Sequence, residues 1–138
     1  MRRLLLPAAT LLTIALVPSS SVAQDATMQV TTASALQWGD LDVPGFDRGM
    51  MIAVVHGDPA VGGEPYTIRL KFPDGYRFPA HWHPTTENLT VLSGTFLLAM
   101  EGEETGELVT YAPGDYLHIP PRNAHSGGAT GETVIQLH

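Results

Sequence analysis

The sequence predicts an all-β protein, a sandwich or a barrel built from short strands. Within residues 24–138, no segment repeats its apolar residues with the 3.6-residue period of a helix. Short apolar runs recur instead, and glycine, proline and aspartate separate them, which is typical of strands joined by turns. The 138-residue chain shows no internal repeat and no linker, so we expect a single domain.

The clearest strand pattern covers residues 66–72, where apolar and polar side chains alternate so that one face of the strand would be apolar. We expect residues 39–49 to form a loop, Ser93-Gly94 to form a tight turn, and residues 101–106 to form an acidic hairpin loop. The remaining strands are expected at residues 35–38, 50–56, around 81–83, 87–92, 95–100, 107–111, 115–119 and 133–138.

The first 23 residues have the features of a secretory signal peptide. Arg2 and Arg3 give a short positive segment, residues 4–17 are apolar, and small residues stand at Ser21 and Ala23 before the expected cleavage point. A membrane anchor is the alternative, but an apolar run of 14 residues is shorter than the roughly 20 needed to span a bilayer. We therefore expect a periplasmic or secreted protein without stable membrane insertion after cleavage. Sec export and twin-arginine export both remain open.

Cleavage after Ala23 would leave an N-terminal arm, residues 24–34, followed by one domain, residues 35–138. That chain would carry five basic and 14 acidic residues, a net charge of −9 with histidine neutral. An acidic surface disfavours nucleic acid and anionic membranes as partners. The chain has no cysteine, so it forms no disulfide, and any metal ligands must be histidines or carboxylates.

Two histidines and a carboxylate stand close together, because His81, His83 and Glu87 fall within seven residues. Residues two apart in a strand point to the same side, so His81 and His83 would project together and Trp82 would face the other way. Neighbouring imidazoles with a carboxylate are typical ligands of a first-row transition metal. The stretch therefore predicts a metal site. A metal-free pocket with a polar histidine wall is the alternative.

Residues 75–94 resemble the first sequence motif of the cupin superfamily, G-x5-H-x-H-x3-E-x6-G. All its fixed positions are present, at Gly75, His81, His83, Glu87 and Gly94. The second cupin motif, G-x5-P-x-G-x2-H-x3-N, is matched only at Gly114, Pro120 and His125, because Arg122 and Ala129 replace its glycine and asparagine. The two motifs and their flanking strands cover essentially all of residues 24–138, and the chain looks like a small exported single-domain bacterial cupin.

The resemblance implies a small jelly-roll β-barrel that binds one divalent transition metal through His81, His83, Glu87 and His125. Three imidazoles and a carboxylate suit Fe, Mn, Zn, Cu, Ni or Co, and do not suit an all-oxygen calcium or magnesium site. Neither replacement in the second motif removes a ligand. If the turn there needs a residue with positive φ, Asn123 is expected to tolerate it.

Several residues outside this set have structural interpretations. We expect Trp82 to lie on the outer face or at a subunit contact, and His118 to be a surface residue or the partner of another side chain. We expect His56 at the exposed end of its strand and His138 to be uninvolved.

Four other residues have both a structural and a functional interpretation. Arg69 either lies on an exposed strand face, which we favour, or lines the barrel and binds an anionic substrate. Tyr66, Phe96 and Met100 are core candidates that could also line a pocket, with the core favoured.

Three functions are consistent with these features. The first is an exported metal-dependent enzyme acting on a small organic molecule, with dioxygenase or oxidoreductase chemistry preferred over isomerase or decarboxylase chemistry and with Glu87 as a general base. The second is a non-catalytic module that binds a metal or a small ligand, and the third is a structural or sensory domain with an empty site. The sequence names neither the metal nor the substrate, and a homodimer remains open.

Overall fold

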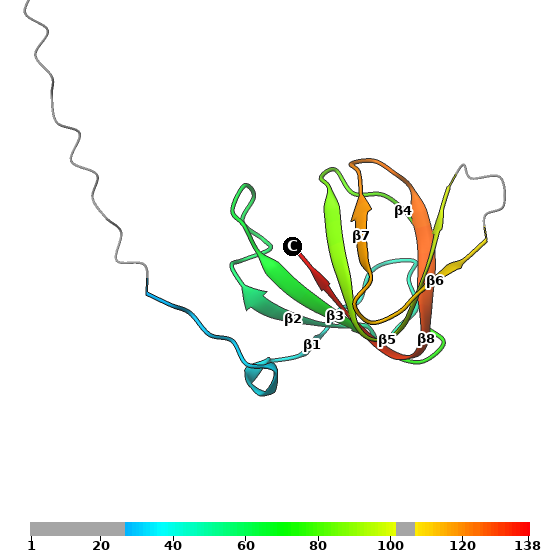
Figure 1. Cartoon of the computed structure of the whole chain (residues 1–138). Coiled ribbons are helices and arrows are strands. Elements are labelled where there is room, and N and C mark those ends of the chain that lie inside the picture. The colour runs from blue at the N-terminus through cyan, green and yellow to red at the C-terminus, as the bar shows by residue number, and fades with distance from the viewer. Residues whose placement is uncertain (1–26, 102–106) are drawn as a thin grey trace, which may run out of the picture.

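The computed structural model describes residues 27–101 and 107–138, and within them almost all regular structure is β (Figure 1). The predicted signal peptide and the centre of the acidic loop lie outside the described residues. The elements in chain order are the 3-10 helix η1 (Ala33–Ala35) and the strands β1 (Gly39–Asp40), β2 (Met51–His56), β3 (Thr67–Phe72), β4 (Arg77–His81), β5 (Glu87–Met100), β6 (Val109–Tyr111), β7 (Tyr116–Ile119) and β8 (His125–Leu137). None of the helical structure in the described part is long or apolar enough for a membrane span.

The strands pair antiparallel in one sheet with the order β1-β2-β3-β8-β5-β6, while β4 pairs with β8 and β7 pairs with β5. Two long strands close it into a barrel. β8 pairs with β3 through residues 133–137 and with β4 through residues 125–128, so it belongs to both sides of the barrel. β5 pairs with β7 at its start, with β6 near its end, and with β8 along most of its length. The expected all-β jelly-roll barrel is confirmed.

The predicted tight turn at Ser93-Gly94 is wrong, because β5 runs through it as one strand. The pairing of β5 with β8 shifts register between Val91 and Thr95, which is a bulge rather than a reversal of the chain. Gly94 has a φ of 76° there, a conformation that favours glycine. Buried Thr133 compensates for the interrupted ladder, since its hydroxyl accepts a hydrogen bond from the amide of Thr95 at 3.0 Å. The bulge bends β5 so that its two halves can join different neighbours.

Two other strand predictions need correction. Residues 35–38 do not form a strand: the chain makes η1 at Ala33–Ala35, and its first strand is the short β1, paired with β2. The last strand begins at His125 and not at residue 133. The glycines of residues 127–131 suggest a loop by local propensity, yet tertiary pairing with β4 and β5 holds them in β8. A Cβ on Gly127 would meet the carbonyl of Leu97 and the ring of Phe78, so these glycines permit close packing of the strands.

The core lies inside the barrel and is rich in aromatic and branched side chains. Phe78 packs against Phe72 and Phe96, with ring centroids 6.4 and 6.1 Å apart, and it also stands edge-on to His81 at 5.3 Å. Leu89, Val91 and Ile135 are almost fully buried. The core therefore extends directly up to the histidines and gives them a rigid apolar support.

Candidate metal centre

The four candidate ligands come from strand ends that the barrel brings together. His81 is the last residue of β4, His125 is the first residue of β8, and these two residues are register partners. Glu87 is the first residue of β5. The strand expected to carry both histidines of the first motif stops at His81, so His83 belongs to the loop that follows. Alternation along a strand therefore does not explain how the two imidazoles meet. The conformation of the loop after His81 brings His83 next to it.

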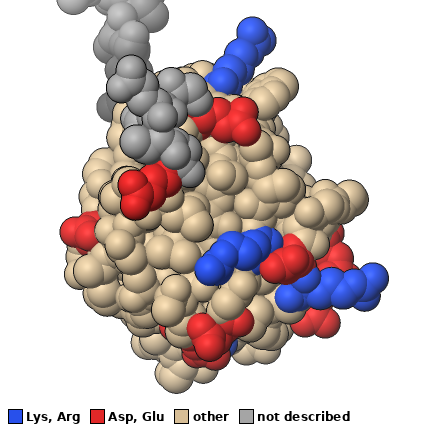
Figure 2. Space-filling view, turned by 90° about the vertical axis from the view of Figure 1, so that its right-hand side faces the viewer, with Lys and Arg blue, Asp and Glu red and all other residues tan. Residues whose placement is uncertain are grey.

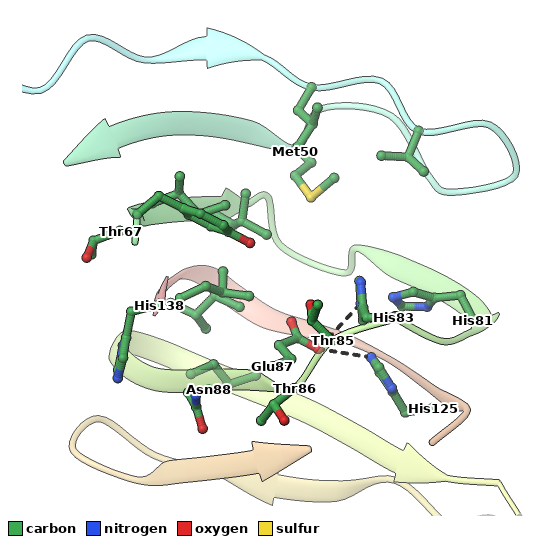
Figure 3. A pocket seen from close by; sticks show the side chains of 18 of the residues that line it. Met50, Thr67, His81, His83, Thr85, Thr86, Glu87, Asn88, His125 and His138 are labelled. Carbon is green, nitrogen blue, oxygen red and sulfur yellow. Dashed lines mark ion pairs between the residues drawn. The ribbon is translucent and has the colours of Figure 1, made fainter. Parts of the chain in front are cut away.

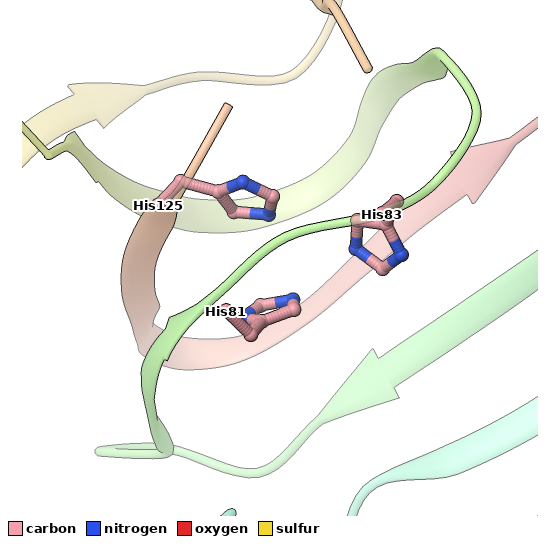
Figure 4. Close-up of side chains that lie close together, drawn as sticks. All are labelled: His81, His83 and His125. Carbon is pink, nitrogen blue, oxygen red and sulfur yellow. The ribbon is translucent and has the colours of Figure 1, made fainter. Parts of the chain in front are cut away.

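The three imidazoles converge although His125 is more than forty residues away in sequence (Figure 4). Ring centroids are 4.5 Å apart for His81 and His125, 5.0 Å for His81 and His83, and 5.5 Å for His83 and His125. One ring nitrogen from each histidine lies within 4.8 Å of the other two, an arrangement that could hold a metal ion.

Glu87 stands at the edge of this group. Its Oε2 lies 3.4 Å from Nε2 of His83 and 3.4 Å from Nε2 of His125 (Figure 3). The 4.8 Å group itself consists of the three imidazoles without the carboxylate. The structure thus brings all four predicted residues together, with the histidines as the tighter set.

Backbone carbonyls orient two of the rings. Nδ1 of His81 donates a hydrogen bond to the carbonyl of Pro79, and Nδ1 of His125 donates one to the carbonyl of Asn123, each at 3.0 Å. A carbonyl oxygen can only accept, so in the neutral ring the proton is on Nδ1 and Nε2 keeps its lone pair. This is the form in which histidine binds a metal, with its other nitrogen held in place by a neighbour.

Two buried polar atoms of the site have no hydrogen-bond partner among residues 27–101 and 107–138. They are Nε2 of His83 and Oε2 of Glu87, which face each other at a distance longer than a good hydrogen bond. Leaving a buried polar atom unpaired costs about 1–3 kcal/mol. A cation bound between them would satisfy both atoms, so the residues present fit a divalent transition metal.

The environment moves the pKa values of His81 and His125 in opposite directions. Burial lowers the pKa of His81 from 6.5, because the charged imidazolium loses solvation, and the backbone hydrogen bond to Pro79 compensates only in part. Burial also lowers the pKa of His125, but its contact with the Glu87 carboxylate and the carbonyl of Asn123 outweigh this, and the net pKa lies above 6.5. Of these two residues, His81 is the one whose surroundings favour the neutral state that metal binding requires.

The turn before His125 explains the departures from the second cupin motif. Arg122 itself has a φ of 63°, a conformation that favours glycine, and the expectation that Asn123 would take the positive φ is wrong. The amide of Arg122 donates a 2.8 Å hydrogen bond to the carbonyl of His83, which ties the two ligand-bearing loops together. Ala129 is fully buried and its amide bonds to Tyr76, away from the three histidines.

His118 and Trp82 lie where they were expected, whereas Arg69 is half-buried and not exposed as favoured. His118 pairs with Oδ1 of Asn88 at 2.9 Å and is not part of the histidine group. Nε of Arg69 donates to the side chain of Gln136 at 3.1 Å, and Arg69 does not line the cavity described below. Trp82 is 55% exposed on the outside of the barrel.

A cavity of about 800 Å³ opens beside the histidines and continues between β3, β5 and β8. His81, His83, Glu87 and His125 all line it, so a molecule in the cavity would reach the candidate metal centre. Thr85 and Thr86, which the sequence did not single out, line it next to Glu87 (Figure 3). This size is within the range of roughly 300–1,000 Å³ that is usual for small-molecule sites.

The cavity changes the interpretation of several side chains. Tyr66 lines the cavity and is 37% exposed, so the expectation that it belongs to the core is wrong, whereas Phe96 is buried and also lines the cavity. Met100 packs against the core and borders a separate groove. His56 is exposed as expected, but it and His138 both line the cavity, so His138 is not remote from the site. The alternation of residues 66–72 carried this signal, since Tyr66, Ile68 and Leu70 of its apolar face line the cavity.

Comparison with known proteins agrees with the architecture. The family model described as Cupin domain matches residues 68–137, about half of the chain. A search of curated proteins gave no match.

Solved structures with the same fold are diverse in name. KdgF from a Halomonas species is 24% identical with a TM-score of 0.60, over 80% of this chain and 92% of that chain. The polyketide cyclase RemF from Streptomyces resistomycificus is 17% identical with a TM-score of 0.66, over 80% and 78% of the chains. A predicted oxalate decarboxylase from Thermotoga maritima is 20% identical with a TM-score of 0.62, over 79% and 94%. At these identities the likeness concerns the fold alone. From the family model and the barrel together, this chain belongs to the cupin family.

Proposed function

We propose that His81, His83, Glu87 and His125 bind one divalent transition metal, and that this centre carries out dioxygenase- or oxidoreductase-type chemistry on a small organic molecule. One observation carries the proposal. Three imidazoles converge within 4.8 Å beside a carboxylate oxygen that has no hydrogen-bond partner in the described part of the chain. Nitrogen-rich sets with one carboxylate suit Fe, Mn, Zn, Cu, Ni or Co.

The residues of the chain would have distinct tasks. His81 and His125, each held through Nδ1 by a backbone carbonyl, would present Nε2 to the ion, and His83 would complete the set of imidazoles. Such an ion supplies Lewis acidity and, if it is iron or copper, a centre that reacts with dioxygen. Glu87 also lines the cavity, where its carboxylate is placed to accept a proton from a bound molecule. The apolar walls would keep bulk water away from that proton transfer.

The test combines metal content with turnover. Protein purified from its native compartment should contain close to one equivalent of one first-row metal and should consume oxygen with some members of a panel of small organic substrates. Glu87→Gln should abolish turnover more completely than it reduces metal content. Stoichiometric metal without turnover, together with a copurifying ligand recovered unchanged, would instead support the non-catalytic binding module.

The place of action is part of the proposal. The charged, apolar and small-residue segments of residues 1–23 support export, with cleavage after Ala23 giving a periplasmic or secreted protein. Lys and Arg side chains are few on the face shown in Figure 2 and are interspersed with Asp and Glu, which agrees with a protein that does not bind nucleic acid. Mass spectrometry of protein from the native host should show a chain beginning at Gln24. A cytoplasmic protein that retains residues 1–23 would contradict export.

A further inference from the structure

We propose that the cavity beside the histidines binds an uncharged, predominantly apolar organic molecule, with one polar group at the histidine end, and that it rejects multiply charged anions. This inference names the substrate class for the same site. It rests on the proposed function only for what happens at the polar group, since binding of the apolar body is argued from the cavity walls.

The walls are largely apolar. Apolar side chains of β3, β5 and β8 form one part of the surface: Ile68, Leu70, Leu89, Leu98, Ile135 and Leu137. Leu41, Val43, Phe46 and Met50, which precede β2, add further apolar surface. Burying apolar surface of a ligand against such walls removes that surface from water, which favours binding. Figure 3 shows Thr67 and His138 at the end of the cavity opposite His81, His83 and His125. The polar side chains between these ends, Thr85, Thr86, Glu87 and Asn88, come from one short segment, so they leave the other walls apolar. An elongated molecule with an apolar body fits this distribution.

Charge argues against anions. No Lys or Arg lines the cavity within the described residues. The two carboxylates that line it, Glu64 and Glu87, carry negative charge and would repel an anion. A carboxylate, phosphate or sulfate placed against the apolar walls would lose its hydration without gaining a cationic partner. A bound divalent metal would accept one anionic or polar group, but a second or third charge on the same molecule would have no counter-charge.

The cationic side chains of β3 and β4 are directed elsewhere. Arg69 bonds to Gln136, and Nζ of Lys71 lies 4.4 Å from the centre of the Trp38 ring. Arg77 donates to the carbonyls of Tyr76 and Ala129. Each cation already has a partner outside the cavity, so anion recognition would require a rearrangement of these contacts.

The experiment uses the uncharged dye N-phenyl-1-naphthylamine, whose fluorescence rises in apolar surroundings, with metal-loaded and chelator-treated full-length protein. We expect saturable binding of about one dye per chain in both states, displacement by 1-naphthol, and no displacement by oxalate or citrate. Ile68→Trp should weaken dye binding at least tenfold by filling the cavity. Leu70→Trp, on the same face of β3 as Ile68, provides a second blocking variant if the first does not fold. Lys71→Trp, on the opposite face of β3, is the matched control and should leave binding unchanged.

Each outcome decides one claim. Absence of dye binding, equal binding by both blocking variants and the wild type, or displacement by oxalate or citrate as effective as that by 1-naphthol would overturn the inference. Dye binding by a protein that takes up no metal would leave this inference standing and would refute the proposed function. Metal uptake without dye binding would refute this inference and would leave the proposed metal binding standing.

Discussion

Gly75 and Gly94, the two ends of the first cupin motif, offer a direct test of why the motif needs glycine. Both have a φ of 76°, so an alanine at either position carries the same backbone strain. Their surroundings differ. A Cβ at Gly75 would meet nothing within 4 Å, whereas one at Gly94 would run into the carbonyl of Glu132 and into Thr133. The pair therefore separates the effect of backbone strain from that of crowding.

The magnitudes follow from these surroundings. The left-handed conformation costs an alanine about 1–2 kcal/mol. Because alanine also restricts the unfolded chain, about 0.4–1 kcal/mol of that cost is recovered. Gly75→Ala should therefore lower the free energy of unfolding by about 1 kcal/mol. Gly94→Ala adds overpacking of about 1–3 kcal/mol and displaces the Thr133 hydroxyl from the amide of Thr95, for a total of about 2–4 kcal/mol.

Urea denaturation of the chelator-treated variants would measure both values, with the midpoint and slope fitted separately so that a change in the unfolded state is recognised. Chelation removes any contribution of bound metal to stability. Equal losses at the two positions would refute the reasoning, because crowding at the bulge would then contribute nothing. A larger loss at Gly75 than at Gly94 would contradict the observed packing of β5 against β8.

Three further predictions concern the site and its loops. Zinc or manganese at one hundred times its dissociation constant should raise the free energy of unfolding by about 2.7 kcal/mol. Thermal melts should show that His81→Ala loses this gain and that His118→Ala keeps it. A gain retained by His81→Ala would contradict the ligand set. In metal-free protein, NMR titration should place the pKa of His125 above 6.5 and that of His81 below it, and coincident titrations would exclude the proposed environments. The stability that His125 contributes is present below pH 6.5 and is lost as the pH rises through its raised pKa. The stability that His81 contributes is present above pH 6.5 and is lost as the pH falls through its lowered pKa. Arg122→Gly should leave the free energy of unfolding unchanged or raise it by up to about 1 kcal/mol, because glycine tolerates the positive φ. Arg122→Val should lower the free energy of unfolding by more than about 1 kcal/mol. The opposite order in urea denaturation would show that the turn does not have the observed conformation.

The fold and the composition of the candidate site could be predicted because their signals are local. Alternation in residues 66–72 marked β3, and fixed spacing within residues 75–94 named three of the four candidate ligands. His125 required the second motif, since only the pairing of β4 with β8 brings it next to His81. Local spacing alone could not have shown that contact.

The errors arise where tertiary contacts override local preference. Ser93-Gly94 has the composition of a turn, yet pairing with β8 on both sides turns it into a bulge. The glycines at the start of β8 have low strand propensity, but they are needed where other backbones approach closely. The cavity could not be predicted from the sequence, because its walls come from many segments that are far apart in the chain. The positions of Tyr66 and His138 were therefore missed.

The central claim is that His81, His83, Glu87 and His125 form one metal site. Its most direct test is metal stoichiometry, measured by elemental analysis after dialysis against a single divalent transition metal, for the wild type, His125→Ala and the control His118→Ala. The structure predicts close to one equivalent in the wild type and in the control, and a loss of most bound metal in His125→Ala, since the imidazole that closes the group would be missing. A wild-type protein that retains no metal, or a His125→Ala variant that retains a full equivalent, would contradict the claim.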